Sequence, residues 1–240
     1  MSAVLYAVEG GVATLTLNRP ESRNALNLEM CNGLIEAAIS ASRDQSMKLL
    51  LVRANGPVFC AGADLKERQG MTEAQVRERR MKGFAAYAAL EALPMPAVAV
   101  VEGPAVGSGC EIAGACDFIV ATSAASFRTP EAIRGTVGAT QRLPRILGKR
   151  LAKDLMFTGR TLTAEEAREA GLVSRLVDAQ GLEEMLGEMK GEILKAPQGA
   201  LRLAKRVIDR GLERDPAGAL EEEIAAIEEQ LAAGQWMGRK

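Results

Sequence analysis

The chain has 240 residues, with 30 basic and 31 acidic side chains and a formal net charge of −1. This balance, together with five Phe, two Tyr and one Trp, argues against nucleic acid or an anionic membrane as the main partner. The apolar runs are far shorter than the ~20 residues of a membrane-spanning helix, and the N-terminus shows no signal-peptide pattern, so we expect a cytoplasmic protein.

Histidine and cysteine usage limits the possible chemistry. The sequence contains no histidine, so a Ser-His-Asp triad, a Cys-His pair or a His-ligated metal site cannot form within one chain. The four cysteines lack CxxC spacing and have apolar or small neighbours, which is typical of reduced, buried thiols rather than disulfides or zinc ligands. Acid–base chemistry therefore falls to carboxylates, Lys, Tyr or Cys. The cysteines are Cys31, Cys60, Cys110 and Cys116.

Hydrophobic patterning in the first half predicts strands that alternate with helices. The segment 12–17 alternates apolar and polar residues as a half-buried strand does, and the turn 18–21 ends it. Helical spacing of apolar residues follows over 26–41, and a charged helix is expected over 71–90. Continuous apolar runs of strand length predict buried strands over 48–54, 97–101 and 118–121.

The last third is predicted to be mainly helical. Thr163 and Glu166 fit a capping box for the helix AEEAREA, which stops at Gly171 before a short strand over 172–177. After about residue 183 the pattern is helical throughout, and it ends in an amphipathic segment over 217–233. Strands alternating with helices predict an α/β fold with mostly parallel pairing, and the helical end suggests a separate packing or assembly element.

A glycine-rich segment over 107–111, GSGCE, follows a predicted buried strand and opens an apolar helix. It fails as the dinucleotide-binding pattern GxGxxG, because Ile112 occupies the last glycine position and Pro104 interrupts the turn. It also fails as a GxSxG nucleophile elbow, because Val106 occupies the first glycine position and no histidine can activate Ser108. What remains is a loop with free N–H groups at a helix start that can stabilise negative charge.

Three acidic residues are candidate functional groups. Glu111 lies in an apolar stretch, so it is either a first-turn residue that complements the helix dipole or a partly buried carboxylate in a glycine-lined cleft. Glu131 follows Thr129 and Pro130 in the pattern of an ordinary helix start. The segment around Asp64 fits a strand-to-helix turn and a binding loop equally well. Local sequence leaves these alternatives open.

The order and spacing of these segments resemble the enoyl-CoA hydratase/isomerase family from about residue 12 to residue 177. The resemblance implies a crotonase-like (ClpP/crotonase) α/β fold, in which a spiral of repeated ββα units over 1–185 holds the acyl-CoA site and 186–240 forms a helical trimerisation region. The motifs that carry it are NRPESRNALN at 18–27, FCAGADLKE at 59–67, VEGPAVGSGCEIAGACDFIVA at 101–121, FRTPE at 127–131 and TQRLPRILG at 140–148.

The same resemblance implies the site residues. The backbone N–H groups of Ala63 and Ser108 would form an oxyanion hole for a thioester carbonyl, and Glu111 and Glu131 would be the two catalytic glutamates of a hydratase. Ser108 departs from the glycine usual at its position, but only its backbone is used. No metal or redox cofactor is implied, since coenzyme A arrives with the substrate. The implied CoA or substrate contacts are Arg23, Ala25, Ala61, Asp64, Leu65 and Lys66.

The implied activity is syn addition of water to a 2-enoyl-CoA thioester, giving a 3-hydroxyacyl-CoA. Two alternatives stay open: a delta3-delta2-enoyl-CoA isomerase, which can work with one base at the position of Glu131, and a non-catalytic acyl-CoA-binding or RNA-binding relative. Glu111 favours the hydratase. The charged stretch 77–82 fits either a solvated helix face or a surface near CoA phosphates.

The sequence departs from the family pattern in two places, the loop after Glu131 and the C-terminal end. The loop GTVGATQRL after Glu131 is a few residues shorter than the common family stretch, and it would wall the acyl pocket. The chain also stops before the longer tail that in relatives packs near the CoA of a neighbouring subunit. We therefore expect self-association to a trimer or a dimer of trimers without that CoA contact.

Overall fold

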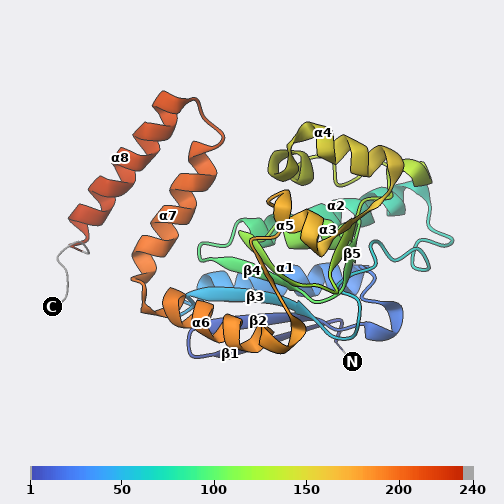
Figure 1. Cartoon of the computed structure of the whole chain (residues 1–240), viewed down its shortest axis with the longest axis horizontal. Helices are drawn as coiled ribbons and strands as arrows, with labels where there is room; N and C mark the ends of the chain where they lie inside the picture. Colours follow the sequence, from blue (N-terminus) through green and yellow to red (C-terminus); the bar gives the residue numbers. More distant parts are fainter. Residues whose placement is uncertain (1, 235–240) are drawn as a thin grey trace.

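A computed structural model describes residues 2–234, so residues 235–240 of the predicted assembly region lie outside the described residues. Two sheets form its centre (Figure 1): six strands in the order β1-β2-β3-β4-β6-β9 and three in the order β5-β7-β8. The strands are β1 (Val4–Glu9), β2 (Val12–Leu17), β3 (Leu49–Ala54), β4 (Ala97–Val101), β5 (Pro104–Val106), β6 (Phe118–Thr122), β7 (Ser126–Arg128), β8 (Thr161–Thr163) and β9 (Arg175–Val177). The helices are α1 (Leu28–Arg43), α2 (Glu73–Glu91), α3 (Ser108–Gly114), α4 (Arg142–Thr158), α5 (Ala164–Glu169), α6 (Leu182–Lys195), α7 (Gln198–Gly211) and α8 (Pro216–Ala232).

Most strand pairs are parallel, as the alternation of strands and helices predicts. The four predicted strands of the first half are β2, β3, β4 and β6, and each pairs in parallel with the next. Only β1 with β2 and β7 with β8 run antiparallel among the named strands. A helix between parallel strands returns the chain to the same end of the sheet, so the loops after the strands gather on one edge.

The larger sheet is buried on both faces, which explains its continuous apolar runs. Along β3, Leu49 and Leu51 belong to one core cluster and Leu50 and Val52 to another. The first cluster includes Leu186 and its neighbours on α6, whereas the second includes residues of α1, α2 and α3. Successive side chains of a strand point to opposite faces, so α6 covers one face of the sheet and α1, α2 and α3 pack on the opposite face.

The chain passes twice from the larger sheet to the smaller one, which produces the ββα spiral implied by the family resemblance. β4 leads into β5 and then α3, and β6 leads into β7 and then α4. Gly103 makes the first crossing possible, because a Cβ at this position would overlap the carbonyl oxygen of Pro57. The glycine-rich segment 107–111 therefore follows a strand of the smaller sheet and begins α3.

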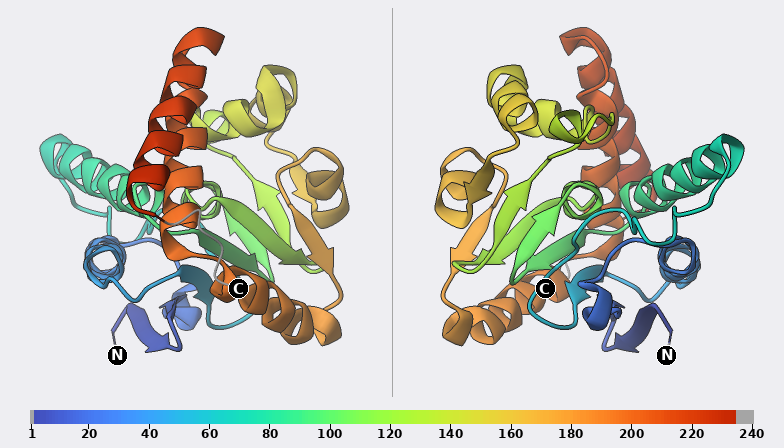
Figure 2. Two further views of the ribbon diagram at one scale, coloured as in Figure 1. Left: turned by 90° about the vertical axis from the view of Figure 1, so that its left-hand side faces the viewer. Right: turned by 90° about the vertical axis from the view of Figure 1, so that its right-hand side faces the viewer.

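The C-terminal region is three helices rather than one helical stretch. Pro197 separates α6 from α7, and Asp215 caps α8 by accepting a hydrogen bond from the N–H of Gly218 at 2.8 Å. The predicted boundary at 185/186 falls inside α6, which packs on the sheet. Beyond it, α7 and α8 form a hairpin at the side of the molecule (Figure 2). Within residues 2–234, no helix combines the length and apolar character needed to span a bilayer.

Candidate active site

Two chain segments meet to form a pair of main-chain donors. Cys60 bridges Ala105 of β5, and Ala63 bridges Leu26. Between them Gly62 has a φ of +97°, and a Cβ there would lie 3.1 Å from the carbonyl oxygen of Val106. The same Cβ would lie 4.0 Å from the backbone nitrogen of Ser108, so Ala63, the next residue, lies close to the start of α3. Neither the N–H of Ala63 nor that of Ser108 donates to an acceptor within the described part of the chain, and both residues line one cavity.

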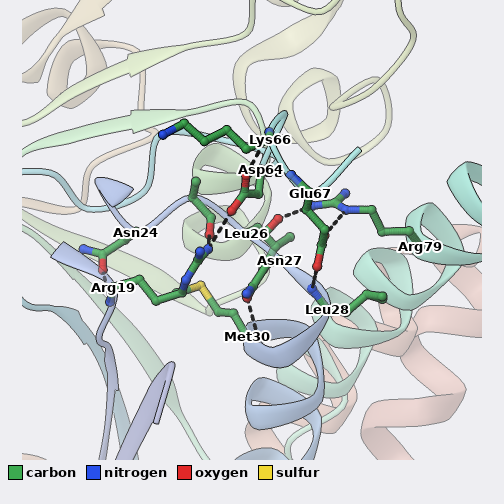
Figure 3. Close-up of polar contacts among 11 residues, drawn as sticks. Arg19, Asn24, Leu26, Asn27, Leu28, Met30, Asp64, Lys66, Glu67 and Arg79 are labelled. Carbon is green, nitrogen blue, oxygen red and sulfur yellow. Dashed lines mark hydrogen bonds and ion pairs between the residues drawn. The ribbon is translucent and has the colours of Figure 1, made fainter. Parts of the chain in front are cut away.

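A charged contact fastens the segment after Ala63 (Figure 3). The Asp64 carboxylate accepts a hydrogen bond from Nη1 of Arg19 at 2.9 Å and from the N–H groups of Lys66 and Glu67 at 3.0 and 3.2 Å. Burial acts to raise the pKa of Asp64, but the hydrogen bonds from Arg19 and the backbone outweigh it and leave this pKa lowered. Asp64, a predicted ligand contact, is thus bound by protein groups, closes the turn after Ala63 and lines neither cavity described below.

Two buried polar residues, Asn24 and Arg79, hold the segment that pairs with Ala63. The sequence did not single out Asn24, and it placed Arg79 in the charged stretch 77–82, where neither a solvated face nor a surface near CoA phosphates describes this buried side chain. The Asn24 side chain, 0% exposed, accepts a hydrogen bond from the N–H of Arg19 and donates to the carbonyls of Asn55 and Val58. Arg79 on α2 is 4% exposed and donates to Glu67 and to the carbonyl of Leu26 (Figure 3). Together they tie the backbone beside Ala63 to β3 and α2.

Glu111 is a buried carboxylate on α3. It is 6% exposed, and its Oε2 accepts a hydrogen bond from Nη1 of Arg142 at 2.7 Å. Its Oε1 is buried and has no hydrogen-bond partner within residues 2–234. Burial raises the pKa of Glu111, and the neighbouring Arg142 guanidinium opposes that rise. Of the two interpretations of Glu111, the structure supports the buried carboxylate over the surface residue that complements the helix dipole.

Glu131 lies across the same cavity. It precedes a single 3-10 turn over Ala132–Arg134, so the expected helix start does not lead into an α-helix. Its carboxylate packs between Gly107, where a Cβ would overlap Oε1, and Gly138, where a Cβ would lie 3.1 Å from Cγ. The shortened loop thus still supports this side chain. Burial, with a smaller contribution from the charge of Glu111, raises the pKa of Glu131.

These groups line two adjoining cavities. The inner one, of about 100 Å³, is lined by Ala63, Ser108, Glu111 and Glu131, among others. The outer one, of about 450 Å³, shares Ala63, Arg68, Glu131 and Thr136 with it. A bound molecule can therefore extend from the outer cavity to the two carboxyl groups of the inner one. The loop after Glu131 contributes part of the wall, with Thr136, Val137, Gly138 and Ala139.

Some of the remaining predicted substrate contacts line a cavity and others do not. Ala61 and Leu65 line the outer cavity, whereas Arg23, Ala25 and Lys66 line neither of the two. Arg23 and Lys66 are exposed to solvent, and the carbonyl of Ala25 accepts a hydrogen bond from Arg19. Of the predicted set, the structure brings together Ala63, Ser108, Glu111 and Glu131.

Three residues of the site were not predicted from the sequence: Tyr87 and Arg68 line the inner cavity, and Arg142 contacts Glu111. Tyr87 of α2 is 4% exposed, and burial raises the pKa of its phenol. The Arg142 guanidinium lies 5.8 Å from the centroid of the Tyr87 ring. Arg68 lines both cavities. The motif TQRLPRILG contains Arg142, but nothing local in the sequence indicates its partner on α3.

A larger hollow lies elsewhere and does not contain this chemistry. A space of about 610 Å³ lies between the end of α2 and the α7–α8 hairpin, and neither Glu111 nor Glu131 lines it. Among residues 2–234 no three acidic or cysteine side chains are grouped to hold a metal ion. The inner cavity, in contrast, sets two main-chain donors, suited to an oxyanion, beside two carboxyl groups that can transfer protons.

Comparisons with known proteins agree with this geometry. The model of the family described as enoyl-CoA hydratase/isomerase matches residues 7–235. An Arabidopsis thaliana protein named "Probable enoyl-CoA hydratase 2, mitochondrial" is 39% identical, over 95% of this chain and 77% of its own. An enoyl-CoA hydratase from Bacillus anthracis is similar with a TM-score of 0.91 at 35% identity, over 94% and 90% of the two chains. A candidate enoyl-CoA hydratase from Thermobifida fusca in complex with acetoacetyl-CoA has a TM-score of 0.87 at 25% identity, over 97% and 96%.

Proposed function

The chain belongs to the enoyl-CoA hydratase/isomerase family, and we propose that it catalyses syn addition of water to a 2-enoyl-CoA thioester, giving a 3-hydroxyacyl-CoA. One observation carries this proposal: Glu111 and Glu131 line a single small cavity with the N–H groups of Ala63 and Ser108. The acetoacetyl-CoA held by the Thermobifida fusca neighbour supports an acyl-CoA as the substrate.

The main-chain donors suit the charge that develops in this reaction. Conjugation with the thioester makes C3 electrophilic, so attack by water moves negative charge onto the thioester oxygen as an enolate. Donors that are already fixed stabilise this charge without reorganising, and each contributes ~3 kcal/mol in comparable oxyanion holes. The N–H groups of Ala63 and Ser108, which have no acceptor among the described residues, are available for this role.

The two carboxyl groups divide the proton transfers. Glu111 accepts a proton from water as the hydroxide bonds to C3, and Glu131 donates a proton to C2 on the same face of the double bond. The reaction thus leaves Glu111 protonated and Glu131 charged, and exchange with solvent restores the starting state. Because the two groups share one cavity, they titrate as a coupled pair.

A panel of 2-enoyl-CoA thioesters, followed by loss of the conjugated absorbance, tests the activity and finds the preferred acyl chain. Glu111→Gln and Glu131→Gln are each expected to lower kcat by about 100-fold or more, because each removes one proton transfer. Glu102→Gln is a matched control, since Glu102 is on the surface and pairs with Arg53. Near-normal activity of both active-site variants would contradict the assignment.

The isomerase is the second candidate, because Glu131 could move a proton between C2 and C4 alone. One observation favours it: Arg142 occupies one oxygen of Glu111, and the other oxygen is buried without a partner among residues 2–234. Offering a 3-enoyl-CoA separates the two functions. An isomerase forms the conjugated 2-enoyl-CoA without adding a hydroxyl group, and it keeps this activity in Glu111→Gln. A hydratase loses its activity in Glu111→Gln.

We also propose that the protein self-associates through the α7–α8 hairpin as a trimer or dimer of trimers. Large apolar side chains on these helices and on the turn between them are 47% to 84% exposed in the single chain, far more than core residues. Sedimentation at micromolar concentration should give the mass of three or six chains, and Leu212→Asp with Ile224→Asp should lower it. The exposed side chains are Ile208, Leu212, Leu220, Ile224, Ile227 and Leu231.

A further inference from the structure

Arg142 connects the buried carboxylate of Glu111 to a second, exposed one. Its Nη1 lies 2.7 Å from Oε2 of Glu111, and its Nη2 lies 2.6 Å from Oε2 of Glu91 at the end of α2. The guanidinium also lies 5.8 Å from the centre of the Tyr87 ring. These contacts come from α2 and α3, while Arg142 itself begins α4, so its orientation is fixed by three elements.

The two partners of Arg142 do not share its charge equally. The Glu91 side chain is 55% exposed, whereas the Glu111 side chain is 7% exposed. Solvent screens the exposed pair, so it contributes little beyond orientation. The buried pair is screened much less, so Glu111 receives most of the stabilisation. Its second oxygen, Oε1, is buried and without a partner among residues 2–234, and it is free to accept a hydrogen bond from water.

Glu131 has no comparable cation. No ion pair to its carboxylate is found within residues 2–234, and its Oε2 is buried without a partner. The charged groups that face it are Glu111 from α3, Arg80 from α2, Arg134 from its own turn and Arg68, which lines both cavities without an ion pair to Glu131 among residues 2–234. The Arg80 guanidinium is engaged by the carbonyl of Val137. The two carboxyls therefore differ in one respect, which is the direct guanidinium contact on Glu111.

We propose that Arg142 is a positioning residue that keeps the negative charge on Glu111 and so leaves the proton of the pair on Glu131. This inference rests on the hydratase function proposed above, in which Glu111 must be the base and Glu131 the acid. Without Arg142, both groups would sit in similarly dry surroundings and compete for the same proton. A large share of the molecules would then hold the proton on the wrong carboxyl group.

The direction of the pH effect follows from the contacts. The titratable groups whose charges act on Glu111 are Arg142 from α4, Glu91 and Tyr87 from α2, and Glu131. Of these Arg142 alone is a cation, and it favours the charged form of Glu111. Removing it raises the pKa at which Glu111 gains a proton, so activity should be lost at higher pH as the solution is acidified. The acid limb of the kcat/KM profile reports this ionisation in the free enzyme.

Three variants test the proposal through their pH profiles. Arg142→Gln is expected to move the acid limb up by ~1 pH unit or more and to lower kcat at least about tenfold, while KM changes little. Arg142→Lys keeps the charge without the two-pronged contact, so its acid limb should stay near that of the parent while kcat falls in part. Arg145→Gln is the matched control, because Arg145 on the same helix is exposed and, among residues 2–234, its guanidinium donates hydrogen bonds to Gln141 alone.

An infrared measurement tests the location of the proton without turnover and without altering Arg142. At neutral pH the parent should show the C=O band of a buried protonated carboxyl, and this band should vanish in Glu131→Gln and persist in Glu111→Gln. If Arg142→Gln does not fold, the pH profile of Arg142→Lys and the infrared band in the two glutamate variants test the proposal. An unmoved acid limb in folded Arg142→Gln, or a band that is lost in Glu111→Gln and kept in Glu131→Gln, overturns the inference. Failure of the parent to hydrate any enoyl-CoA refutes the proposed function instead, and the band still locates the proton.

Discussion

Replacing Asp64 by Asn tests whether a charge fastens the loop that carries the Ala63 donor. Asp64 is 7% exposed, and it accepts hydrogen bonds from Arg19 and from the N–H groups of Lys66 and Glu67. The amide keeps one oxygen for the two N–H groups but sets an NH2 group against the guanidinium. Losing a charge-assisted hydrogen bond of about 1.5–3 kcal/mol, and leaving Arg19 without its partner, should lower the free energy of unfolding at pH 7 by about 2–4 kcal/mol.

This loss should depend on pH with a defined sign. Burial acts to raise the pKa of Asp64, but its hydrogen bonds from Arg19 and the backbone leave that pKa lowered in the folded protein. Such a group contributes stability that is fully present above its unfolded pKa of about 3.9 and is lost as the pH falls through the folded pKa. The difference between the parent and Asp64→Asn should therefore be constant at neutral pH and shrink only at strongly acidic pH.

Urea unfolding followed by circular dichroism at several pH values measures this difference. Asp44→Asn is a matched control, because Asp44 makes similar hydrogen bonds to Ser46 on an exposed turn, and its loss should be much smaller. The reasoning is wrong if Asp64→Asn is as stable as the parent at pH 7, or if the difference does not shrink in acid. A raised KM with unchanged stability would instead support the substrate contact implied by the family resemblance.

Two further substitutions test the buried polar contacts beside the site by urea unfolding. Asn24→Ala removes three hydrogen bonds and should lower the free energy of unfolding by about 2–4 kcal/mol, and a loss below ~1 kcal/mol would show that water replaces them. Arg79→Ala leaves Glu67 without its buried partner and should cost about 3–5 kcal/mol. Arg77→Ala on the exposed face of the same helix should change stability by less than about 0.5 kcal/mol, so equal losses at both positions would contradict the assignment.

The sequence predicts the larger sheet well because its strands are buried on both faces. The run 97–101 is β4 without any shift of its ends, and all five residues are buried. The capping box of Thr163 and Glu166 is also found, with both hydrogen bonds present. In contrast β5, β7 and β8 have three residues each. Three residues are too few to show a period, so these strands of the smaller sheet could not be predicted.

For the site too, the sequence predicts what is encoded locally and misses contacts between residues far apart in the chain. Motif spacing indicates which segments carry Ala63, Ser108, Glu111 and Glu131, and the structure brings these segments to one cavity. Motif spacing does not indicate which residues pair with the charged side chains of the site. Arg19 is 45 positions from Asp64, and Arg142 is 31 positions from Glu111. Such pairs form only when the spiral closes, so a local pattern cannot distinguish a ligand contact from a structural ion pair.

An oxyanion hole made of main-chain donors depends on the backbone that carries them, so it should be sensitive to a methyl group that no substrate touches. Gly62→Ala introduces a Cβ 3.1 Å from the Val106 carbonyl at a φ of +97°, next to the Ala63 donor. Gly70→Ala is the matched control, since Gly70 has a φ of +79° and no atom within 4 Å of the added Cβ. Both variants should lose about 1–2 kcal/mol of stability from backbone strain. Only Gly62→Ala should also lower kcat, toward the ~100-fold loss seen when one such donor is removed, and an equal loss of kcat in Gly70→Ala would show that strain, rather than the placement of the donor, limits the reaction.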